Sequence, residues 1–291
     1  MSYAAIISKS LKARGIETLS ENLNPYWGAG FYGLDKIGAF NDLNSEKKNA
    51  LLTNLSQAQL EEAIHVERRG IDFASKMILM ARDDEEKQVY SLIHADELEH
   101  FFEIKRFLHC TESPEDQNPF ISLLKEIVET SDSYLMVFFL QIILEGWGMT
   151  HYNDLASNCS DANMQVLLKR ILHDEARHHG TGLVHYKLRA DDKRDIDAMT
   201  EIMAKFLFMI QIGPQTTIAN LYRQHEGLTK AQVTSAFTEC ESVINAQKTL
   251  AGVKRLLSHD LDQSLIERLD KRGMFRAYTA EESTEVCLTL V

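Results

Sequence analysis

The 291-residue sequence predicts an all-α protein, and two observations carry this prediction. Only four prolines occur, so long stretches lack the residue that most often ends a helix. Within these stretches apolar residues recur at every third or fourth position, which is the period of an amphipathic helix. We find no stretch with the alternation of apolar and polar residues that is typical of a half-buried strand.

Composition narrows the class of protein. The apolar content of 44% allows a sizeable core, and the net charge of −12, from 31 basic and 43 acidic residues, disfavours a nucleic-acid partner. The four cysteines are scattered without a Cys-x-x-Cys pair, which suits reduced thiols. The first residues lack the order of a signal peptide, and the most apolar stretch, residues 134–144, is too short to span a membrane. We expect a soluble, cytoplasmic protein.

The N-terminal region, residues 1–55, is predicted to hold a short helix and then a loop over residues 24–28 that is rich in glycine and aromatic residues. The simplest interpretation of this loop is surface packing. The alternatives are a cap on one end of a helix bundle or a cover over a pocket.

The first long helix is predicted over residues 56–82, with Ser56 and Gln59 as a capping box at its start. One face is apolar except for Glu67, and an ionised carboxylate in an apolar stripe is costly unless something pairs with it. Taken alone, Glu67 fits a buried salt bridge as well as a metal ligand. Glu61 and Glu62 lie off this face, and we expect them to be solvated.

A second helix is predicted over residues 83–110, and Glu97 and His100 interrupt its apolar face. Because the turn before it is short, the first and second helices should be antiparallel neighbours. A linker over residues 111–119 and a short helix over residues 120–130 should then lead to the next pair of helices.

The third long helix, over residues 133–157, has Glu145 as the one charged residue of its apolar face. Gly146 and Gly148 follow, and a glycine inside a helix costs about 1 kcal/mol relative to alanine. They indicate a local distortion or open space beside Glu145, or else close helix packing. Three apolar neighbours suggest either a pocket or plain core: Phe138, Ile142 and Met149.

The fourth long helix, over residues 161–188, contains Asp-Glu-x-Arg-His. Residues three apart share one face of a helix, so Glu175 and His178 project together. The second helix repeats the pattern with Glu97 and His100. The spacing to a lone upstream glutamate also repeats, since 97 − 67 = 30 and 175 − 145 = 30. Each helix pair can therefore bring its residues to the same height.

Four carboxylates and two imidazoles thus converge in a predicted helical core, which is the carboxylate-bridged dinuclear arrangement found in four-helix bundles. Carboxylate oxygens with imidazole suit iron or manganese better than copper or a structural zinc. Without bound cations, so many buried charges would be strongly unfavourable. The candidate ligands are Glu67, Glu97, His100, Glu145, Glu175 and His178.

These residues resemble the ferritin-like di-iron carboxylate superfamily. The Asp-Glu-x-Arg-His motif resembles that of bacterial multicomponent monooxygenase hydroxylases and of acyl-carrier-protein desaturases. The resemblance covers residues 56–188 and implies a ferritin-like four-helix bundle in which Glu97 and Glu175 bridge two metals. It also implies that two aspartates accept the N–H groups of the ligand histidines and that an arginine pairs with both aspartates. These residues are Asp96, Asp174 and Arg177.

The sequence departs from these families at two positions. Glu99 stands where the monooxygenases tend to have arginine. Ile171 stands where the aminobenzoate N-oxygenases, which are closer in size, have an additional histidine ligand. His94 and His185 lie near the predicted ligand face and are interpreted as supporting or packed residues, with metal ligation as the alternative.

Tyr90 and Tyr152 are predicted two turns from ligands along their own helices, which is about 10 Å by helical rise. We interpret them as core tyrosines. A stable tyrosyl radical, as in ribonucleotide reductase small subunits, is the alternative that the resemblance implies.

Residues 189–291 are predicted to add helices to the same domain and to end in a tail over residues 278–291. A strongly apolar helix is predicted over residues 202–212, and a capping box at Thr229 opens a helix to about Ser258. These helices either wall a substrate cavity or form a dimer surface.

The resemblance implies a non-haem di-iron oxygenase or oxidase with two iron ions, or manganese, and O2 as co-substrate. The expected reaction is hydroxylation, N-oxygenation or desaturation of a small organic substrate. An external electron donor such as a ferredoxin or reductase would be required, and the resemblance is compatible with a homodimer as well as a monomer. Ferritin- or rubrerythrin-like iron oxidation or peroxide scavenging is the alternative, and a structural bundle with a vestigial site is a third.

Overall fold

A computed structural model describes residues 2–16, 22, 24–110, 118–189, 194–225, 227–260 and 263–289. These residues form helices and loops without a strand, and one isolated β-bridge joins Trp27 to Cys159, so the predicted all-α fold is confirmed. The elements are α1 Tyr3–Ala13, η1 Leu34–Lys36, α2 Gly38–Asn41, α3 Ser45–Met80, α4 Asp84–Lys105, α5 Pro119–Thr130, α6 Ser133–Met136, η3 Val137–Leu144, α7 Glu145–Asn158, α8 Ala162–Leu188, α9 Ile196–Ile212, α10 Gln215–Gln224, α11 Lys230–Glu239, α12 Ser242–Asp260, α13 Gln263–Lys271 and α14 Ala280–Leu288.

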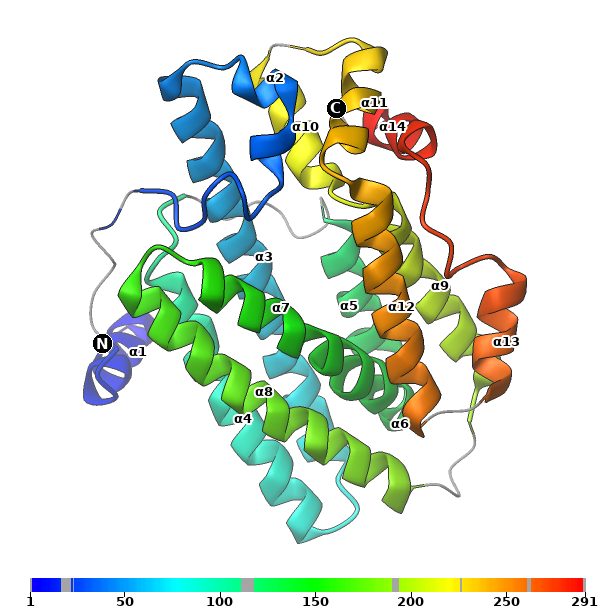
Figure 1. The fold of residues 1–291 in the computed structure, drawn as a ribbon. Coiled ribbons are helices and arrows are strands. Elements are labelled where there is room, and N and C mark those ends of the chain that lie inside the picture. Colours follow the sequence, from blue (N-terminus) through cyan, green and yellow to red (C-terminus); the bar gives the residue numbers. More distant parts are fainter. Residues whose placement is uncertain are drawn as a thin grey trace.

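Two antiparallel helix pairs form the centre of the molecule (Figure 1). α3 packs along α4, and α7 packs along α8, as the short turns between them predict. The contact between α4 and α8, which joins the two pairs, is much smaller. The space between the pairs is therefore filled by side chains rather than by close approach of helix backbones.

The start of α3 differs from the prediction. The helix begins at Ser45, where the Asn44 side chain accepts the Lys47 N–H at 2.8 Å. Ser56 is not a cap but a buried residue within the helix, and its hydroxyl accepts the backbone N–H of Tyr26 at 3.1 Å. The first long helix thus includes part of the predicted N-terminal region.

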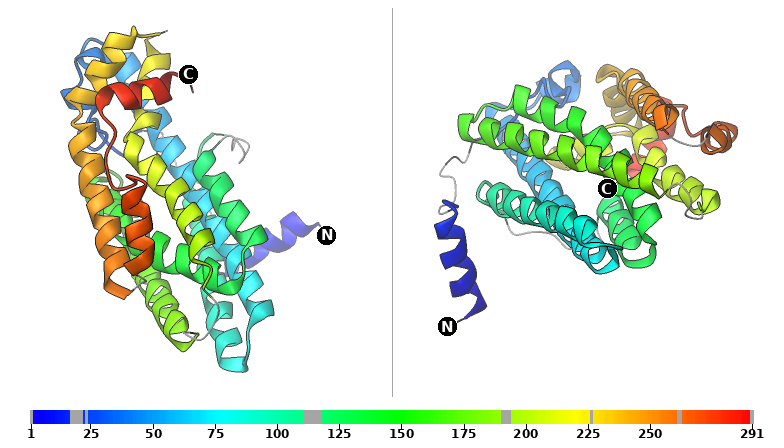
Figure 2. Two further views of the ribbon diagram at one scale, coloured as in Figure 1. Left: turned by 90° about the vertical axis from the view of Figure 1, so that its right-hand side faces the viewer. Right: turned by 90° about the horizontal axis from the view of Figure 1, so that it is seen from below.

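The predicted loop over residues 24–28 caps one end of the helix pairs. Tyr26 and Trp27 are completely buried there, so the prediction of surface packing is wrong. Trp27 Nε1 donates to the Leu155 carbonyl of α7 at 2.9 Å. In contrast, α1 projects from the body of the molecule (Figure 2), and none of its residues is buried.

The third long helix is continuous from Ser133 to Asn158 but is wound in three ways, as α6, the π-helix η3 and α7. The π-helix ends directly before Glu145, which is the local distortion expected near the two glycines. At Gly146 a Cβ would lie 2.9 Å from His179 Cε1, so this glycine allows close packing. At Gly148 a Cβ would meet nothing within 4 Å, so this glycine borders open space. Close helix packing thus explains Gly146, and open space beside the helix explains Gly148.

The C-terminal helices form a layer over the helix pair of α7 and α8, on the side of η3 and α7. α9 and α12 lie side by side and contact η3 (Figures 1 and 2). The helix predicted from Thr229 to Ser258 is broken at Cys240 and Glu241, because Glu241 adopts a left-handed conformation with φ of 56° while Cys240 is buried.

The tail predicted over residues 278–291 is instead largely a helix, α14. A capping box at Thr279 starts it, and the buried Thr284 and Cys287 lie on its inner face, where it packs against α11. Residues 111–117 of the predicted linker lie outside the described residues.

One helical segment, Ser133–Asn158, is long and apolar enough to pass for a membrane span. Over half of its most apolar window, 56%, is buried inside the protein. Such burial is typical of a core helix in a soluble protein, which agrees with the predicted absence of a membrane span.

Candidate metal centre

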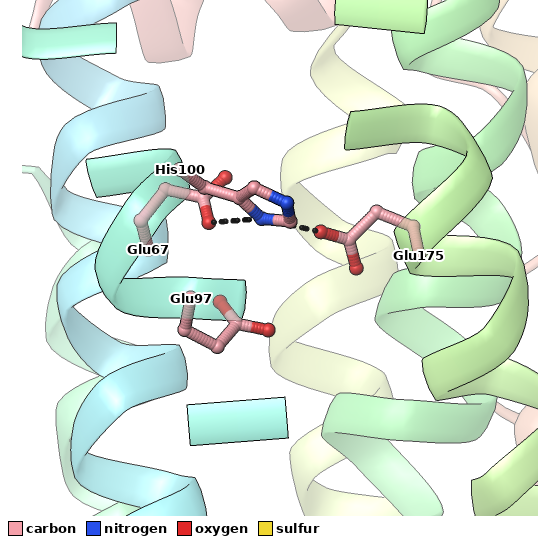
Figure 3. A group of neighbouring side chains, drawn as sticks. All are labelled: Glu67, Glu97, His100 and Glu175. Carbon is pink, nitrogen blue, oxygen red and sulfur yellow. Dashed lines mark hydrogen bonds and ion pairs between the residues drawn. The ribbon is translucent and has the colours of Figure 1, made fainter. Parts of the chain in front are cut away.

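Six acidic and histidine side chains from all four central helices meet between the two pairs. They form two overlapping groups, in each of which the candidate ligand atoms lie within 4.8 Å of one another. The first group, shown in Figure 3, is Glu67, Glu97, His100 and Glu175. The second is Glu97, Glu145, Glu175 and His178. The structure thus brings together all six residues that the sequence predicts as ligands, and two glutamates belong to both groups.

The two histidines direct the same ring nitrogen toward the carboxylates. His100 Nδ1 lies 3.2 Å from Glu67 Oε2 and 3.5 Å from Glu175 Oε1, and Figure 3 shows the ring between these two side chains. His178 Nδ1 lies 3.2 Å from Glu97 Oε1 and 3.5 Å from Glu175 Oε2. The two halves of the cluster therefore have closely matching geometry, with Glu175 in contact with both rings.

The other ring nitrogens contact aspartates on the opposite helix. His100 of α4 has Nε2 3.2 Å from Asp174 Oδ2 of α8, and His178 of α8 has Nε2 3.2 Å from Asp96 Oδ2 of α4. Arg177 Nη2 lies 3.0 Å from Asp96 and 2.8 Å from Asp174, so it joins the two aspartates. A carboxylate that accepts the outer N–H of a histidine fixes the ring so that the inner nitrogen can bind a metal.

Burial and the contacts within the cluster shift the pKa values of the carboxylates in opposite directions. Burial, followed by the charge of Glu175, raises the pKa of Glu97 to about 8 and raises that of Glu145 well above its usual value. Burial acts on Glu175 in the same sense, but hydrogen bonds from His100 and His178 outweigh it and lower its pKa to about 2. Burial lowers the pKa of the two histidines, and the surrounding carboxylates outweigh it and raise both pKa values. Bound divalent cations would supply the positive charge for which these carboxylates compete.

Two features show that the cluster suits a cation. Glu145 Oε2 is shielded from solvent and has no hydrogen-bond partner among the described residues, which is costly for a carboxylate oxygen. On α3, a Cβ at Gly70 would lie 2.1 Å from Glu97 Oε2, so the Glu97 carboxylate occupies the space of the missing side chain. A glycine one turn after Glu67 is the sequence signal for this contact, and it was not among the predicted site residues.

Two further residues outside the predicted set support the ligands. Tyr152 is a buried core tyrosine two turns from Glu145 along α7, as predicted, but its hydroxyl also donates to Glu67 Oε1 at 2.7 Å, which was not predicted. The prediction considered distance along α7 only, whereas Tyr152 reaches across to α3. Gln141, the one polar residue in residues 137–143, is buried and donates its amide to the His178 carbonyl at 3.3 Å.

Tyr90 and His185 belong to a buried polar chain that reaches the cluster through Gln141. The Tyr90 hydroxyl donates to Gln141 Oε1 at 3.0 Å and lies 3.0 Å from His185 Nδ1. His185 Nδ1 in turn lies 3.4 Å from Glu86 Oε1. Among the described residues, neither His185 nor His94 belongs to a candidate ligand group. The interpretation of Tyr90 as a core tyrosine agrees with this placement.

A cavity of about 120 Å³ opens on one side of the cluster. All four cluster glutamates line it, and neither cluster histidine does. Its apolar walls come from α3, α5, η3 and α7: Ala63, Val66, Phe73, Phe120, Leu124, Leu140, Leu144, Trp147 and Leu155. A pocket therefore lies beside Glu145 as predicted, but none of the three residues predicted to line it does so. Phe138 and Ile142 are core residues, and Met149 is absent from the lining.

Glu62 is also part of this lining. It is half-buried, and its Oε2 accepts a hydrogen bond from Asn118 Nδ2 at 2.9 Å. The prediction that Glu62 is solvated is wrong, because α5 packs across this face of α3 and brings Asn118 to it.

Comparisons of the chain with protein-family models, with curated proteins and with solved structures found no match.

Proposed function

We propose that this chain is a non-haem di-iron oxidoreductase of ferritin-like architecture, which uses O2 to oxidise a small organic substrate. The observation that carries the proposal is the pair of Glu/His groups that share Glu97 and Glu175. Two shared carboxylates, flanked by two further carboxylates and two histidines, are the donor set of a carboxylate-bridged dinuclear centre.

The residues present suit two iron ions. Carboxylate oxygens together with imidazole nitrogens favour iron or manganese. Glu67 and His100 would hold one metal, Glu145 and His178 would hold the other, and two glutamates would be shared. The buried Glu145 Oε2, which has no hydrogen-bond partner among the described residues, fits the role of a ligand atom.

When bound, the metals supply the oxidising chemistry, with O2 as co-substrate. The chain orients the ligands, through the two aspartates on the histidine rings and through the Tyr152 hydroxyl on Glu67. The apolar cavity excludes water from the carboxylate side and receives the substrate. An external electron donor such as a ferredoxin or reductase is part of the proposal, since the sequence has no cysteine cluster for an electron-transfer centre.

The cavity also favours oxidation of an organic substrate over ferritin- or rubrerythrin-like iron oxidation or peroxide scavenging. A hydrated iron ion needs a polar path, because removing a charge from water is costly. The cavity beside the cluster has polar lining residues such as Gln59 and Glu62, but aliphatic and aromatic side chains form most of its wall. An apolar organic molecule gains by entering such a space.

Anaerobic ferrous titration followed by exposure to O2 tests the proposal. We expect two iron ions per chain and a change in optical absorption when O2 is added. Glu145→Ala and Glu175→Ala should lower the uptake, because each removes a ligand. Glu61→Ala removes a carboxylate from α3 that belongs to neither group and should keep the wild-type uptake. Equal uptake by wild type and Glu175→Ala would show that the cluster is not a metal site.

A further inference from the structure

A second, larger cavity lies outside the first. Its volume is about 630 Å³, and α3, α9, α10 and the start of α5 bound it. Three residues line both cavities: Glu62, Phe120 and Trp147. We call the larger cavity the outer cavity and these three the neck residues, because they lie where the two cavities meet.

The two aromatic neck residues are held in place by their neighbours. Phe206 of α9 packs against both rings, with centroid distances of 6.2 Å to Phe120 and 5.7 Å to Trp147. On its other side, Trp147 stacks on His151 at 5.7 Å with an interplanar angle of 10°. Aromatic rings packed in this way keep a defined orientation, so the neck presents fixed ring surfaces to a ligand.

The third neck residue, Glu62, is a half-buried carboxylate whose partner is neutral. Asn118 Nδ2 donates to it at 2.9 Å, while Asn118 Oδ1 caps α5 by accepting the Phe120 N–H at 2.9 Å. Within the described part of the chain, no lysine or arginine forms an ion pair with Glu62. Burial raises its pKa above the usual value, and Asn118 and then His65 act in the opposite direction. A carboxylate held in this way attracts a cationic ligand.

We propose that the neck binds the cationic nitrogen of an amine substrate whose apolar part lies in the inner cavity. This inference rests on the proposed function, since it names the substrate class of the same site. The Glu62 carboxylate would accept hydrogen bonds from the ammonium group, and the faces of Phe120 and Trp147 would stabilise its charge. An organic carboxylate is disfavoured, because it would meet Glu62 and then the four cluster glutamates. The arginine that also lines the inner cavity, Arg69, pairs with Asp72 at 3.0 Å, and Arg223 lines only the outer cavity.

The dimensions of the two cavities agree with this substrate class. At ~15 Å³ for each buried water, the inner cavity has room for roughly eight waters, which corresponds to a short alkyl chain or a single ring. The outer cavity is about five times larger, as 630 Å³ against 120 Å³, and admits a bulkier substituent on the nitrogen. The substrate would then be a primary or substituted amine with one short apolar arm.

Calorimetric titration of the full chain with three probes of similar size tests the inference: butylammonium, 1-butanol and butyrate. Butylammonium should bind the wild type about tenfold more tightly than 1-butanol, a ratio typical of one well-placed charge contact, and butyrate should not bind. Glu62→Gln keeps the size of the side chain and should remove the preference for the ammonium probe. Glu61→Gln is the matched control, since Glu61 is adjacent on α3 but lines only the outer cavity, and it should keep the preference.

Ferrous titration of the same preparations separates this inference from the proposed function. Glu62 belongs to neither ligand group, so Glu62→Gln should still bind two iron ions. If the wild type binds no iron, the proposed function is wrong, while the probe titrations on the metal-free protein still decide whether the neck selects amines. The inference is overturned if 1-butanol binds the wild type as tightly as butylammonium. Equal effects of the two glutamine substitutions would overturn it as well.

Discussion

Gly70 shows how a single missing side chain shapes the cluster. Alanine at this position would favour the helix by about 1 kcal/mol through its intrinsic propensity. However, its Cβ would lie 2.1 Å from Glu97 Oε2, so the carboxylate would have to move. We expect Gly70→Ala to weaken iron binding at least about tenfold, within the range seen when groups around a metal site are altered. Ferrous titration measures this effect.

Gly180→Ala is the control for this substitution. Gly180 is exposed on α8, two residues after His178, and a Cβ there would meet nothing within 4 Å. The variant should bind iron as the wild type does. If Gly70→Ala behaves in the same way as Gly180→Ala, the space at Gly70 does not determine the position of Glu97.

At the residue scale, the sequence reveals the candidate ligands better than the residues that support them. Glu175 and His178 are recognisable because a spacing of three places them on one helix face, whatever surrounds the helix. Tyr152 is not recognisable in this way, because its contact with Glu67 depends on how α7 faces α3. Gly70 is similar, since its role appears only when Glu97 is seen beside it.

At the scale of elements, Gly182 allows α8 to pack closely against η3. A Cβ at Gly182 would lie 2.6 Å from Gln141 Cβ, so these two helices approach closely there. We expect Gly182→Ala to lower the free energy of unfolding by about 1–3 kcal/mol, the usual cost of overpacking. Urea denaturation of the metal-free protein measures it. Gly180→Ala on the same helix should instead raise the free energy of unfolding by up to about 1 kcal/mol.

A Gly182→Ala variant as stable as the wild type would mean that the interface between η3 and α8 has spare room. The interface matters for the cluster because Gln141 also donates its amide to the carbonyl of His178. A shift of the π-helix η3 would therefore change the position of the candidate ligand His178.

Errors in predicting the elements have physical causes that the sequence alone does not display. Ser56 and Gln59 have the pattern of a capping box, but Asn44 competes for the same role and the apolar face continues before Ser56. The break at Glu241 lies in a stretch with helical periodicity, and the Glu241 carboxylate pairs with Lys36, 205 residues earlier in the chain. The Asn44 cap is itself local, but which of the two candidate caps is used depends on how far the apolar face packs, and the break at Glu241 depends on contacts made after the helices have come together.

At the scale of the whole molecule, metal binding should be coupled to stability. Buried carboxylates with raised pKa values oppose folding in the metal-free protein, and bound cations would offset this cost. At a free metal concentration one hundred times Kd, a site stabilises the folded state by ~2.7 kcal/mol. For a chain of this size this corresponds to a rise in Tm of roughly 4 °C for each site.

Scanning calorimetry with Mn²⁺, which avoids oxidation during the scan, and with a chelator measures this difference. The same comparison on Glu175→Ala should give a much smaller rise, because this residue belongs to both ligand groups. A rise of equal size in both proteins would point to binding elsewhere on the acidic surface.

The two central helix pairs could be anticipated from the sequence because each pair is joined by a short turn and so is a local structure. The arrangement of α9 and α10 around the outer cavity could not, because it depends on packing between segments far apart in the chain. The neck is therefore a feature that only the folded molecule displays.

The crossed contacts between histidines and aspartates have a consequence for the order in which the protein folds. His100 relies on an aspartate 74 residues away, and His178 relies on one 82 residues away, so neither helix pair contains a complete half-site. Local hairpins form early, whereas contacts between distant segments form late. The cluster would thus be assembled only when both hairpins have docked, and a nascent chain that holds α3 and α4 alone would have a histidine without its orienting partner. Under the proposed function, metal would therefore bind only after both hairpins have docked.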